Sequence, residues 1–448
     1  ILHEGRIAES GPVDILNARG GAGERAAVEI VHGAGRRVVW IARDVSSARS
    51  TLANLVHLDA IAGGTDPMES VLDRPETGSR ILFLPPSLHS PYSDVLPDRS
   101  RLHARMTAFF MISLDFPWSY LVMTAADLGV RIPPPESITA RSDMVRRGMA
   151  MRREDLASLL QSSGYHRLPV VEAAGTFAIR GEIVDVWAPS MIAPARIEMS
   201  WDSVERIRTF DAGTQRTTGE IEEVFVHPVT EIPDDRASRE RAATGVLDLC
   251  DAQEVPTRRA RAVAEEIREG RGILGMRRFL PAFHGRLPAI LDPLAAAGPV
   301  TVVLEDEEEA ISIASGGWRA LESDYSRLRA QGEPAFPPAD LALSGEEVGA
   351  ALDGLPTVRL VPPPGAAPEK ATGRPARDVV DLGAADHRDM TLSVRAGQGG
   401  TARVGSLRPV VARIRAWIDA GVKVTVTSTT ASGTGRLADL LRGHGLDP

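Results

Sequence analysis

The chain has 448 residues, of which 43% are hydrophobic and 25% charged, a globular composition with room for roughly three domains of ~150 residues each. The net charge of −9 and the pI near 5.7 argue against a protein whose main task is to grip nucleic acid, because such proteins usually carry a basic surplus or a basic stripe. A single cysteine, Cys250, excludes a disulfide framework and a cysteine metal site, and fits a reducing cytoplasm.

Both ends of the sequence look cut. The first residue is Ile1 rather than methionine, and the last residues before Pro448 follow directly on a predicted helix. No signal peptide opens the chain, and no apolar run is long enough to span a bilayer. We therefore expect a piece of a longer cytoplasmic protein that makes no contact with a membrane.

Residues 1–136 alternate apolar strands with helices, which is typical of a parallel sheet covered by helices. Strands are predicted at 14–16, 38–42, 81–84 and 120–123, and helices at 24–32 and from residue 46 onward. We expect Gly33 and Gly35 to end the first helix. The proline run 133–135 cannot be helical, and it marks a domain boundary after residue 136.

Residues 137–230 are predicted to form one helix, at 153–161 with Gly164 as its terminator, followed by a small antiparallel sheet. Two strands lie within 176–187, a third starts near 195, and a fourth spans 204–210 after the turn residues Asp202 and Ser203. In the third strand the alternation predicts two faces, one with Ala195, Ile197, Met199 and Trp201, the other with Arg196, Glu198 and Ser200. Such a sheet packs its apolar face on its own chain and offers a charged face to a partner.

The rest of the chain is mixed. In residues 231–361 we expect a helix with solvated charges at 258–271, packing segments at 279–283 and 290–294, and a buried strand at 300–304. Residues 362–390 have the composition of a Pro- and Gly-rich linker. Residues 391–448 open a further small α/β domain, with a helix within 401–420, a strand at 422–427 and a helix at 436–442.

A set of residues between 164 and 216 falls at a spacing shared with known proteins. These are Gly164, Tyr165, Arg167, Glu172, Gly175, Phe177, Arg180, Gly181, Ile183, Asp185, Arg196, Ile197, Glu198, Asp202, Val204, Glu205, Ile207, Arg208, Phe210 and Asp211. The pattern resembles the sheet domain of two bacterial families, the nucleotide-excision-repair helicase UvrB and the transcription-repair coupling factor (Mfd). Gln215, Arg216 and Thr217 resemble the coupling factor's version of the ending. The resemblance covers essentially the whole chain and is weakest between 235 and 400.

The resemblance implies an α/β fold built on a degenerate RecA-like, P-loop-type parallel sheet. Residues 1–136 and 231–361 would be the two parts of that sheet domain, and residues 137–230 an inserted small α+β domain. In both families this inserted domain docks the damage sensor UvrA. The linker, 362–390, and the start of a truncated small α/β domain, 391–448, would follow.

The loop before the first predicted helix resembles a phosphate loop that has lost its chemistry. Against the repair-helicase pattern, Gly23 fills the second glycine position and Ala18 stands at the first, while Glu24 replaces the lysine and Arg25 replaces the Ser or Thr that holds Mg²⁺. A carboxylate at this place repels a triphosphate. We expect a tight βα turn here and no bound nucleotide. The coupling factor has a decayed loop at this place too, whereas UvrB keeps a working one.

Two other segments have both a functional and a structural interpretation. The acidic residues 305–307 follow a strand like the Mg²⁺-binding box of a helicase, or they stabilise the start of a helix. Residues 432–435, between a predicted strand and a predicted helix, bind an anion or form a βα turn. The histidines show no metal spacing, so we expect no metal site and no catalytic residue.

Partner binding remains, and the resemblance places it on arginines that bond to carboxylates of UvrA. Carried over by position, these are Arg167 and Arg180. Glu182 and Asp185 lie beside them and orient the arginines or meet an arginine of the partner. The alternative is that Arg180 and Asp185 pair only within the fold. One anchor is missing, because UvrB has a further arginine where this chain has Ala178.

Two neighbouring features are interpreted as structural. Arg196 and Glu198 are expected to make cross-strand surface pairs. The segment around Pro91 and Tyr92 resembles a Pro-Tyr-Asp turn that both families carry. Between Tyr92 and Arg105 the chain lacks the aromatic-rich hairpin with which UvrB grips DNA, so we do not expect this part to separate strands.

Our hypothesis is that the chain is the N-terminal UvrB-homology region of a coupling factor, a non-catalytic adaptor in the bacterial cytoplasm that recruits UvrA to stalled RNA polymerase. It would need no cofactor itself. In the full-length family, an ATP-dependent DNA translocase, other domains use ATP and Mg²⁺ and contact RNA polymerase and double-stranded DNA. The alternatives are a degenerate UvrB-type ATPase and a free-standing UvrA-binding adaptor.

Overall fold

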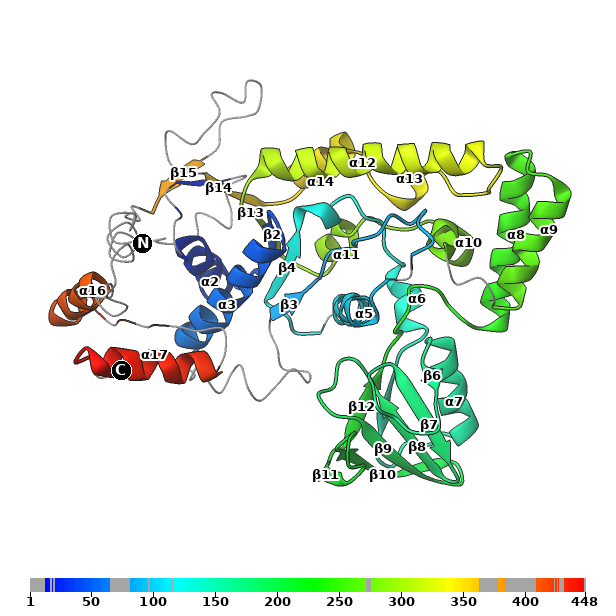
Figure 1. The fold of residues 1–448 in the computed structure, drawn as a ribbon, viewed down its shortest axis with the longest axis horizontal. Coiled ribbons are helices and arrows are strands. Elements are labelled where there is room, and N and C mark those ends of the chain that lie inside the picture. The colour runs from blue at the N-terminus through cyan, green and yellow to red at the C-terminus, as the bar shows by residue number, and fades with distance from the viewer. Residues whose placement is uncertain are drawn as a thin grey trace, which may run out of the picture.

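The computed structural model shows an elongated α/β body from which a small sheet module projects (Figure 1). The structure describes residues 13–16, 18, 21–64, 81–95, 97–114, 116–270, 275–361, 378–382, 408–422, 424, 426 and 431–446. Within these ranges, no helix has the length and hydropathy that crossing a bilayer requires.

A seven-stranded parallel sheet forms the body. In spatial order its strands are β15 (Asp378–Asp381), β1 (Val13–Leu16), β14 (Thr357–Val361), β13 (Val300–Leu304), β2 (Arg37–Ala42), β4 (Tyr120–Thr124) and β3 (Ile81–Phe83). β2 and β13 are far apart in the sequence and pair directly, with Val39 opposite Val302. Residues 1–136 and 231–361 therefore build one sheet, and the predicted α/β class is confirmed.

Helices cover both faces of this sheet. α2 (Ala22–Ala34) and α3 (Val45–Ala62) pack on one face, against side chains such as Val38 and Trp40. α5 (Arg99–Ser113), α11 (Leu291–Ala296), α12 (Glu307–Ala330) and α14 (Gly345–Asp353) pack on the other, against Val39, Ile41 and Val302. Since the central strands are buried on both faces, they are continuous apolar runs rather than alternating ones.

The sheet module is inserted between β4 and α8 (Arg236–Ala252). Its incoming and outgoing chains pair as an antiparallel stem of β5 (Asp143–Arg146) and β12 (Glu223–Val226). Beyond the stem lie α7 (Arg153–Ser162), β6 (His166–Arg167), β7 (Thr176–Arg180), β8 (Ile183–Trp187), β9 (Ala195–Ser200), β10 (Ser203–Phe210) and β11 (Thr217–Glu220). Strands β6 to β11 pair in sequence order, and all pairs except β6 with β7 are antiparallel. The apolar face packs Phe177, Val184 and Ile197 with Leu156 and Leu160 of α7.

Further helices complete the described chain. α8 and α9 (Thr257–Arg268) form a hairpin at one end of the body (Figure 1). Short helices connect the larger elements: η1 (Ala125–Asp127), α6 (Pro135–Thr139), η2 (Met276–Phe279), α10 (Leu280–His284) and α13 (Pro338–Leu341). α16 (Arg408–Asp419) and α17 (Ala431–Gly443) share a small apolar cluster that includes Val411, Ile414 and Leu441. Of the strand predicted at 422–427, residues 422, 424 and 426 are described and lie in no strand, and the other three lie outside the described residues.

The structure corrects several local predictions. Gly33 lies inside α2, and only Gly35, with φ 63°, ends it. Pro135 is the first residue of α6, a position where the missing N–H has no helical partner to lose. The predicted linker contains β15, which pairs with β1. Residues 432–435 lie within α17 rather than in a turn before it.

Trp201 does not share the apolar face of the sheet, as its alternation with Ala195, Ile197 and Met199 predicted. Those three side chains are buried, whereas Trp201 is 92% exposed. Its φ of 51° places it in the turn between β9 and β10. The turn thus starts one residue before Asp202, and this shift takes the indole out of the strand's alternation.

Candidate docking surface

The charged face of the sheet module is organised around Asp185, in the middle of β8. Its carboxylate is only 1% exposed, and Arg196 on the adjacent strand donates to both oxygens, from Nε at 2.8 Å and from Nη2 at 2.9 Å. These hydrogen bonds hold the pKa of Arg196 above its ordinary value. The Arg196 guanidinium also lies over the Phe210 ring, 4.5 Å from its centroid. Asp185 is therefore placed to hold arginines of its own fold.

Arg180 ends β7 on the same face. One of its terminal nitrogens, Nη2, lies 3.9 Å from Asp185 Oδ2, and the side chain is 50% exposed. An ion pair of that length is loose and leaves most of the guanidinium in water. The sequence left two interpretations of Arg180, pairing within the fold and contact with a partner, and the structure is compatible with both. Arg180 lies near Asp185, and the outer N–H groups of its guanidinium stay accessible to water.

Glu182 lies in the two-residue turn between β7 and β8. Its side chain is exposed, and its nearest cation is Arg153 at the start of α7, with 3.9 Å between Oε1 and Nη1. Arg153 also donates to the carbonyl of Gly181, at 2.8 Å. The turn is thereby tied to the helix that packs beneath the sheet. Sequence reasoning missed Arg153, because nothing in the local pattern of α7 indicates a contact with residues 181 and 182.

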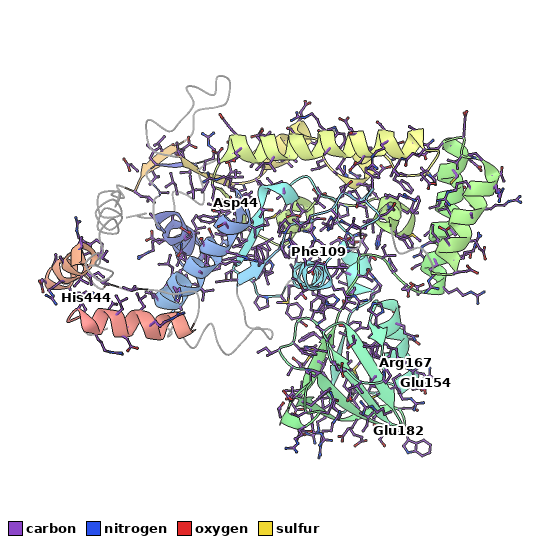
Figure 2. The ribbon with its side chains drawn as sticks, in the orientation of Figure 1. Asp44, Phe109, Glu154, Arg167, Glu182 and His444 are labelled. Carbon is purple, nitrogen blue, oxygen red and sulfur yellow. The ribbon has the colours of Figure 1, made fainter. Side chains whose placement is uncertain are left out.

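Arg167 lies on the edge strand β6, opposite Phe177 of β7, and is exposed. It therefore sits three residues from the level of Arg180, about 10 Å along a strand. Figure 2 shows Arg167, Glu154 and Glu182 along one side of the module. The four predicted docking residues thus divide into a hairpin group of three and one arginine on the sheet edge.

The charged face makes its ion pairs within the module. Glu198 pairs with Arg208 across β9 and β10, as expected of a cross-strand pair, and Arg196 pairs with Asp185 across β8 and β9. Each ion pair formed by these residues, by Arg180 and by Glu182 joins them to residues between 137 and 230. In the described part of the chain, residues 231–361 contribute no ion pair to this face.

In the degenerate phosphate loop, the carboxylate of Glu24 is held by hydrogen bonds from α3. Glu24 lies nearly buried in the first turn of α2, where its Oε1 accepts from Asn54 Nδ2 at 2.9 Å and from Thr51 Oγ1 at 3.4 Å. Both donors belong to α3. The position where the resemblance expects the phosphate-binding lysine thus holds a carboxylate that stabilises the packing of two helices.

The other residues of this loop also have structural roles. A Cβ on Gly23 would lie 2.8 Å from Leu360 Cδ1 and 3.1 Å from the Trp40 ring, so any larger residue would require these side chains to shift. Arg25 points away and pairs with Glu29 at 3.1 Å. Ala18 packs at the border of the apolar cluster beneath α2. These contacts agree with a tight βα turn.

The acidic residues after β13 stabilise the starts of two helices, α12 and α3. Asp306 caps α12 by accepting a backbone N–H at 2.9 Å. Glu305 accepts from Ser47 Oγ at 2.6 Å, and Glu307 pairs with Arg359 at 2.9 Å. The structural interpretation of this segment is therefore supported. Among the described residues, no group of three or more His, Cys, Asp or Glu side chains is arranged to hold a metal ion.

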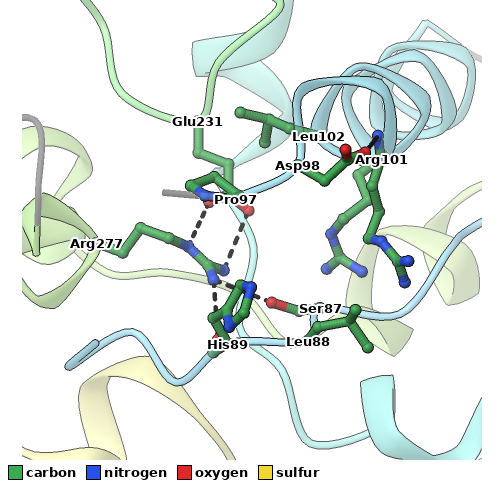
Figure 3. Close-up of a pocket in the computed structure, with 10 residues that line it drawn as sticks. Ser87, Leu88, His89, Pro97, Asp98, Arg101, Leu102, Glu231 and Arg277 are labelled. Atoms are coloured by element: carbon green, nitrogen blue, oxygen red, sulfur yellow. Dashed lines mark hydrogen bonds and ion pairs between the residues drawn. The ribbon is translucent and has the colours of Figure 1, made fainter. Parts of the chain in front are cut away.

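A pocket lies where the proline-rich segment after β3 meets α5 (Figure 3). Arg277 crosses it, donating to Glu231 at 2.7 Å and to Ser87 Oγ at 3.0 Å. Nearby Tyr92 is buried and donates its hydroxyl hydrogen to the carbonyl of Phe336 at 2.8 Å. The turn that resembles the Pro-Tyr-Asp motif therefore ties the two parts of the body together.

Comparison with known proteins identifies the module and its setting. The family model described as UvrB interaction domain matches residues 144–232. The transcription-repair-coupling factor of Myxococcus xanthus is 30% identical over 365 residues, which are 81% of this chain and 30% of that protein. Those of Mycobacterium bovis and Escherichia coli K12 are each 24% identical, over 87% and 60% of this chain.

The chain spans less than a third of the length of these relatives, with 30%, 31% and 23% of each protein covered. The matched domain coincides with the module that carries Arg167, Arg180, Glu182 and Asp185. The chain belongs to the transcription-repair coupling factors, as their N-terminal UvrB-homology region.

Proposed function

We propose that this chain acts in transcription-coupled DNA repair as the adaptor that recruits UvrA, and that it does so through the charged face of the sheet module. The observation that carries the proposal is the arrangement at the β7–β8 hairpin. A buried carboxylate, Asp185, holds one arginine firmly and a second, Arg180, loosely, so that Arg180 is oriented and still half in water.

An arginine held in this way is suited to a carboxylate on a partner. Its planar N–H groups can donate two parallel hydrogen bonds, and the nearby Asp185 carboxylate biases its orientation before binding, so less side-chain freedom is lost. A charge-assisted bond of this kind contributes about 1.5–3 kcal/mol. Arg167 offers a second guanidinium on the sheet edge, and Glu182 an acidic group for a basic residue of UvrA.

The experiment is a titration of the chain with purified UvrA by calorimetry. Arg180→Ala and Arg167→Ala are each expected to weaken binding roughly 10- to 150-fold, which corresponds to about 1.5–3 kcal/mol. Arg146→Ala is the matched control, since Arg146 is an exposed, ion-paired arginine on the stem. Equal affinity of all three variants would refute the site. Failure of the unmodified chain to bind UvrA would refute the function.

We propose no nucleotide chemistry for this chain. The carboxylate of Glu24, held by Asn54, supports that view over the alternative of a degenerate ATPase. Measurable ATP turnover by the chain, abolished by substituting Gly23, would reverse the preference. Contacts with RNA polymerase and double-stranded DNA are proposed for other regions of family members, as is the use of ATP and Mg²⁺.

A further inference from the structure

The turn between β9 and β10 presents an indole to solvent. Trp201 is 92% exposed, and the next most exposed large apolar side chain in the described part of the chain, Val379, is 60% exposed. Scattered exposed apolar side chains are ordinary on protein surfaces. A tryptophan that is almost fully exposed is less ordinary, because its indole is among the largest apolar surfaces that a side chain can expose to water.

The backbone of Trp201 is strained as well. Its φ of 51° lies in the left-handed region, which glycine, asparagine and aspartate adopt far more readily than an aromatic residue. The turn is nevertheless fixed, because Met151 donates its N–H to the carbonyl of Asp202 at 2.9 Å and Ala150 forms a bridge with Ser203. Strained residues held by their surroundings gather at functional sites. A partner that takes the indole would not have to order this backbone first.

Trp201 also lies at the same end of the sheet as the proposed docking hairpin. Met199, two residues before it, donates its N–H to the carbonyl of Glu182 at 2.8 Å, so the end of β9 lies against the β7–β8 turn. In the sheet register Arg180 is opposite Ile183, and Ile183 is opposite Glu198. The half-exposed arginine, the exposed glutamate and the indole thus share one edge of the module.

We propose that Trp201 is the aromatic anchor of the UvrA-docking surface. The inference rests on the proposed function and adds a second kind of contact to it. The indole inserts into an apolar recess of UvrA, and Arg180 bonds to a carboxylate at the rim of that recess. This division matches the energetics of protein interfaces, where tryptophan and arginine dominate and a desolvated aromatic centre is surrounded by polar contacts.

The strain at Trp201 allows a test that separates binding from folding. In Trp201→Gly the left-handed φ costs nothing, so the melting temperature of the chain should stay the same or rise by a few degrees. Its affinity for UvrA should fall roughly 30-fold, the equivalent of about 2 kcal/mol for an interface hot spot. Trp201→Phe should keep part of the affinity. Ile192→Ala is the matched control, because Ile192 is 53% exposed in the loop at the opposite end of β8 and β9.

A spectroscopic readout locates the indole directly. The fluorescence difference between the unmodified chain and Trp201→Gly isolates the emission of Trp201, which should shift to the blue when UvrA is added, since the indole leaves water. Unchanged affinity of Trp201→Gly, with Arg180→Ala weakened, would overturn the inference and leave the proposed function standing. A blue shift that depends on chain concentration without UvrA would assign the indole to self-association and also overturn it. Absence of UvrA binding by the unmodified chain would overturn both.

Discussion

The pair of Asp185 and Arg196 gives the sharpest test of how the docking face is built. Replacing Asp185 by asparagine keeps the shape of the side chain and removes its charge, which leaves the Arg196 guanidinium without its counterion. Removing one partner of a buried ion pair costs about 3–5 kcal/mol. Here Arg196 is 18% exposed, and asparagine still accepts one hydrogen bond. We therefore expect a cost of about 2–3 kcal/mol, below the fully buried range.

Native-state hydrogen exchange is the suitable assay, because it reports the stability of β8 and β9 without assuming that the whole chain unfolds at once. A cost of about 2–3 kcal/mol predicts that slowly exchanging amides of these strands exchange roughly 30- to 150-fold faster in Asp185→Asn. The matched control is Glu198→Gln. Glu198 and its partner Arg208 are 27% and 30% exposed, and an ion pair with that access to water contributes less than about 1 kcal/mol. Equal acceleration in the two variants would refute the view that Asp185 organises the face.

Two further predictions concern the body and its junction with the module. Burial lowers the pKa of His227 from 6.5 to about 4. As the pH falls, His227 therefore takes up a proton in the unfolded chain before it does so in the folded chain. The free energy of unfolding keeps its full value above pH 6.5 and falls by about 3 kcal/mol as the pH approaches 4. His227→Phe keeps the stacking on Phe110, where the ring centroids are 4.7 Å apart. Its urea unfolding midpoint should fall less between pH 6.5 and 4 than that of the unmodified chain. Equal falls of the two midpoints over this pH range would contradict the prediction. Glu24→Lys should lower stability by about 1–3 kcal/mol, because Asn54 loses its acceptor, and should not create ATP binding; a thermal shift that appears only with Mg-ATP would contradict the closed-loop interpretation.

The parts of the fold that sequence predicts well are those set by local pattern. Runs of apolar β-forming residues located the strands of the central sheet, such as β13 at Val300–Leu304. A strand that is buried on both faces must be apolar along its whole length, which makes it easy to find in a sequence. The hairpin of Arg180 and Asp185 was located by resemblance, within a run of β-forming residues at 176–187 whose division into β7 and β8 was not predicted. The local pattern could not show that Asp185 would be buried, since that depends on Arg196 in the next strand.

The parts that sequence missed depend on contacts between distant residues or on small changes of backbone. The stem pairs Arg146 with Glu223, 77 residues apart, and β15 pairs with β1, which lies near the other end of the sequence. α5 lacks a clear apolar stripe, since its Arg105 is buried against Asp127 at 2.7 Å. Trp201 was assigned to β9, but the strand ends at Ser200, and the left-handed backbone of Trp201 takes its side chain out of the strand's alternation.

Because β5 and β12 pair as a stem, the module is joined to the body by two adjacent strands. The polypeptide leaves the body and returns to it on neighbouring strands, with Val145 opposite Val224, so the large parallel sheet is continuous whether or not the insertion is present. Because the two strands of the stem leave the body side by side, the module can be exchanged as a unit if the contacts of Phe225, in β12, with Phe110 and Phe116 of the body are kept. The same property would let an engineer graft it onto another scaffold at any site where two chain ends emerge side by side.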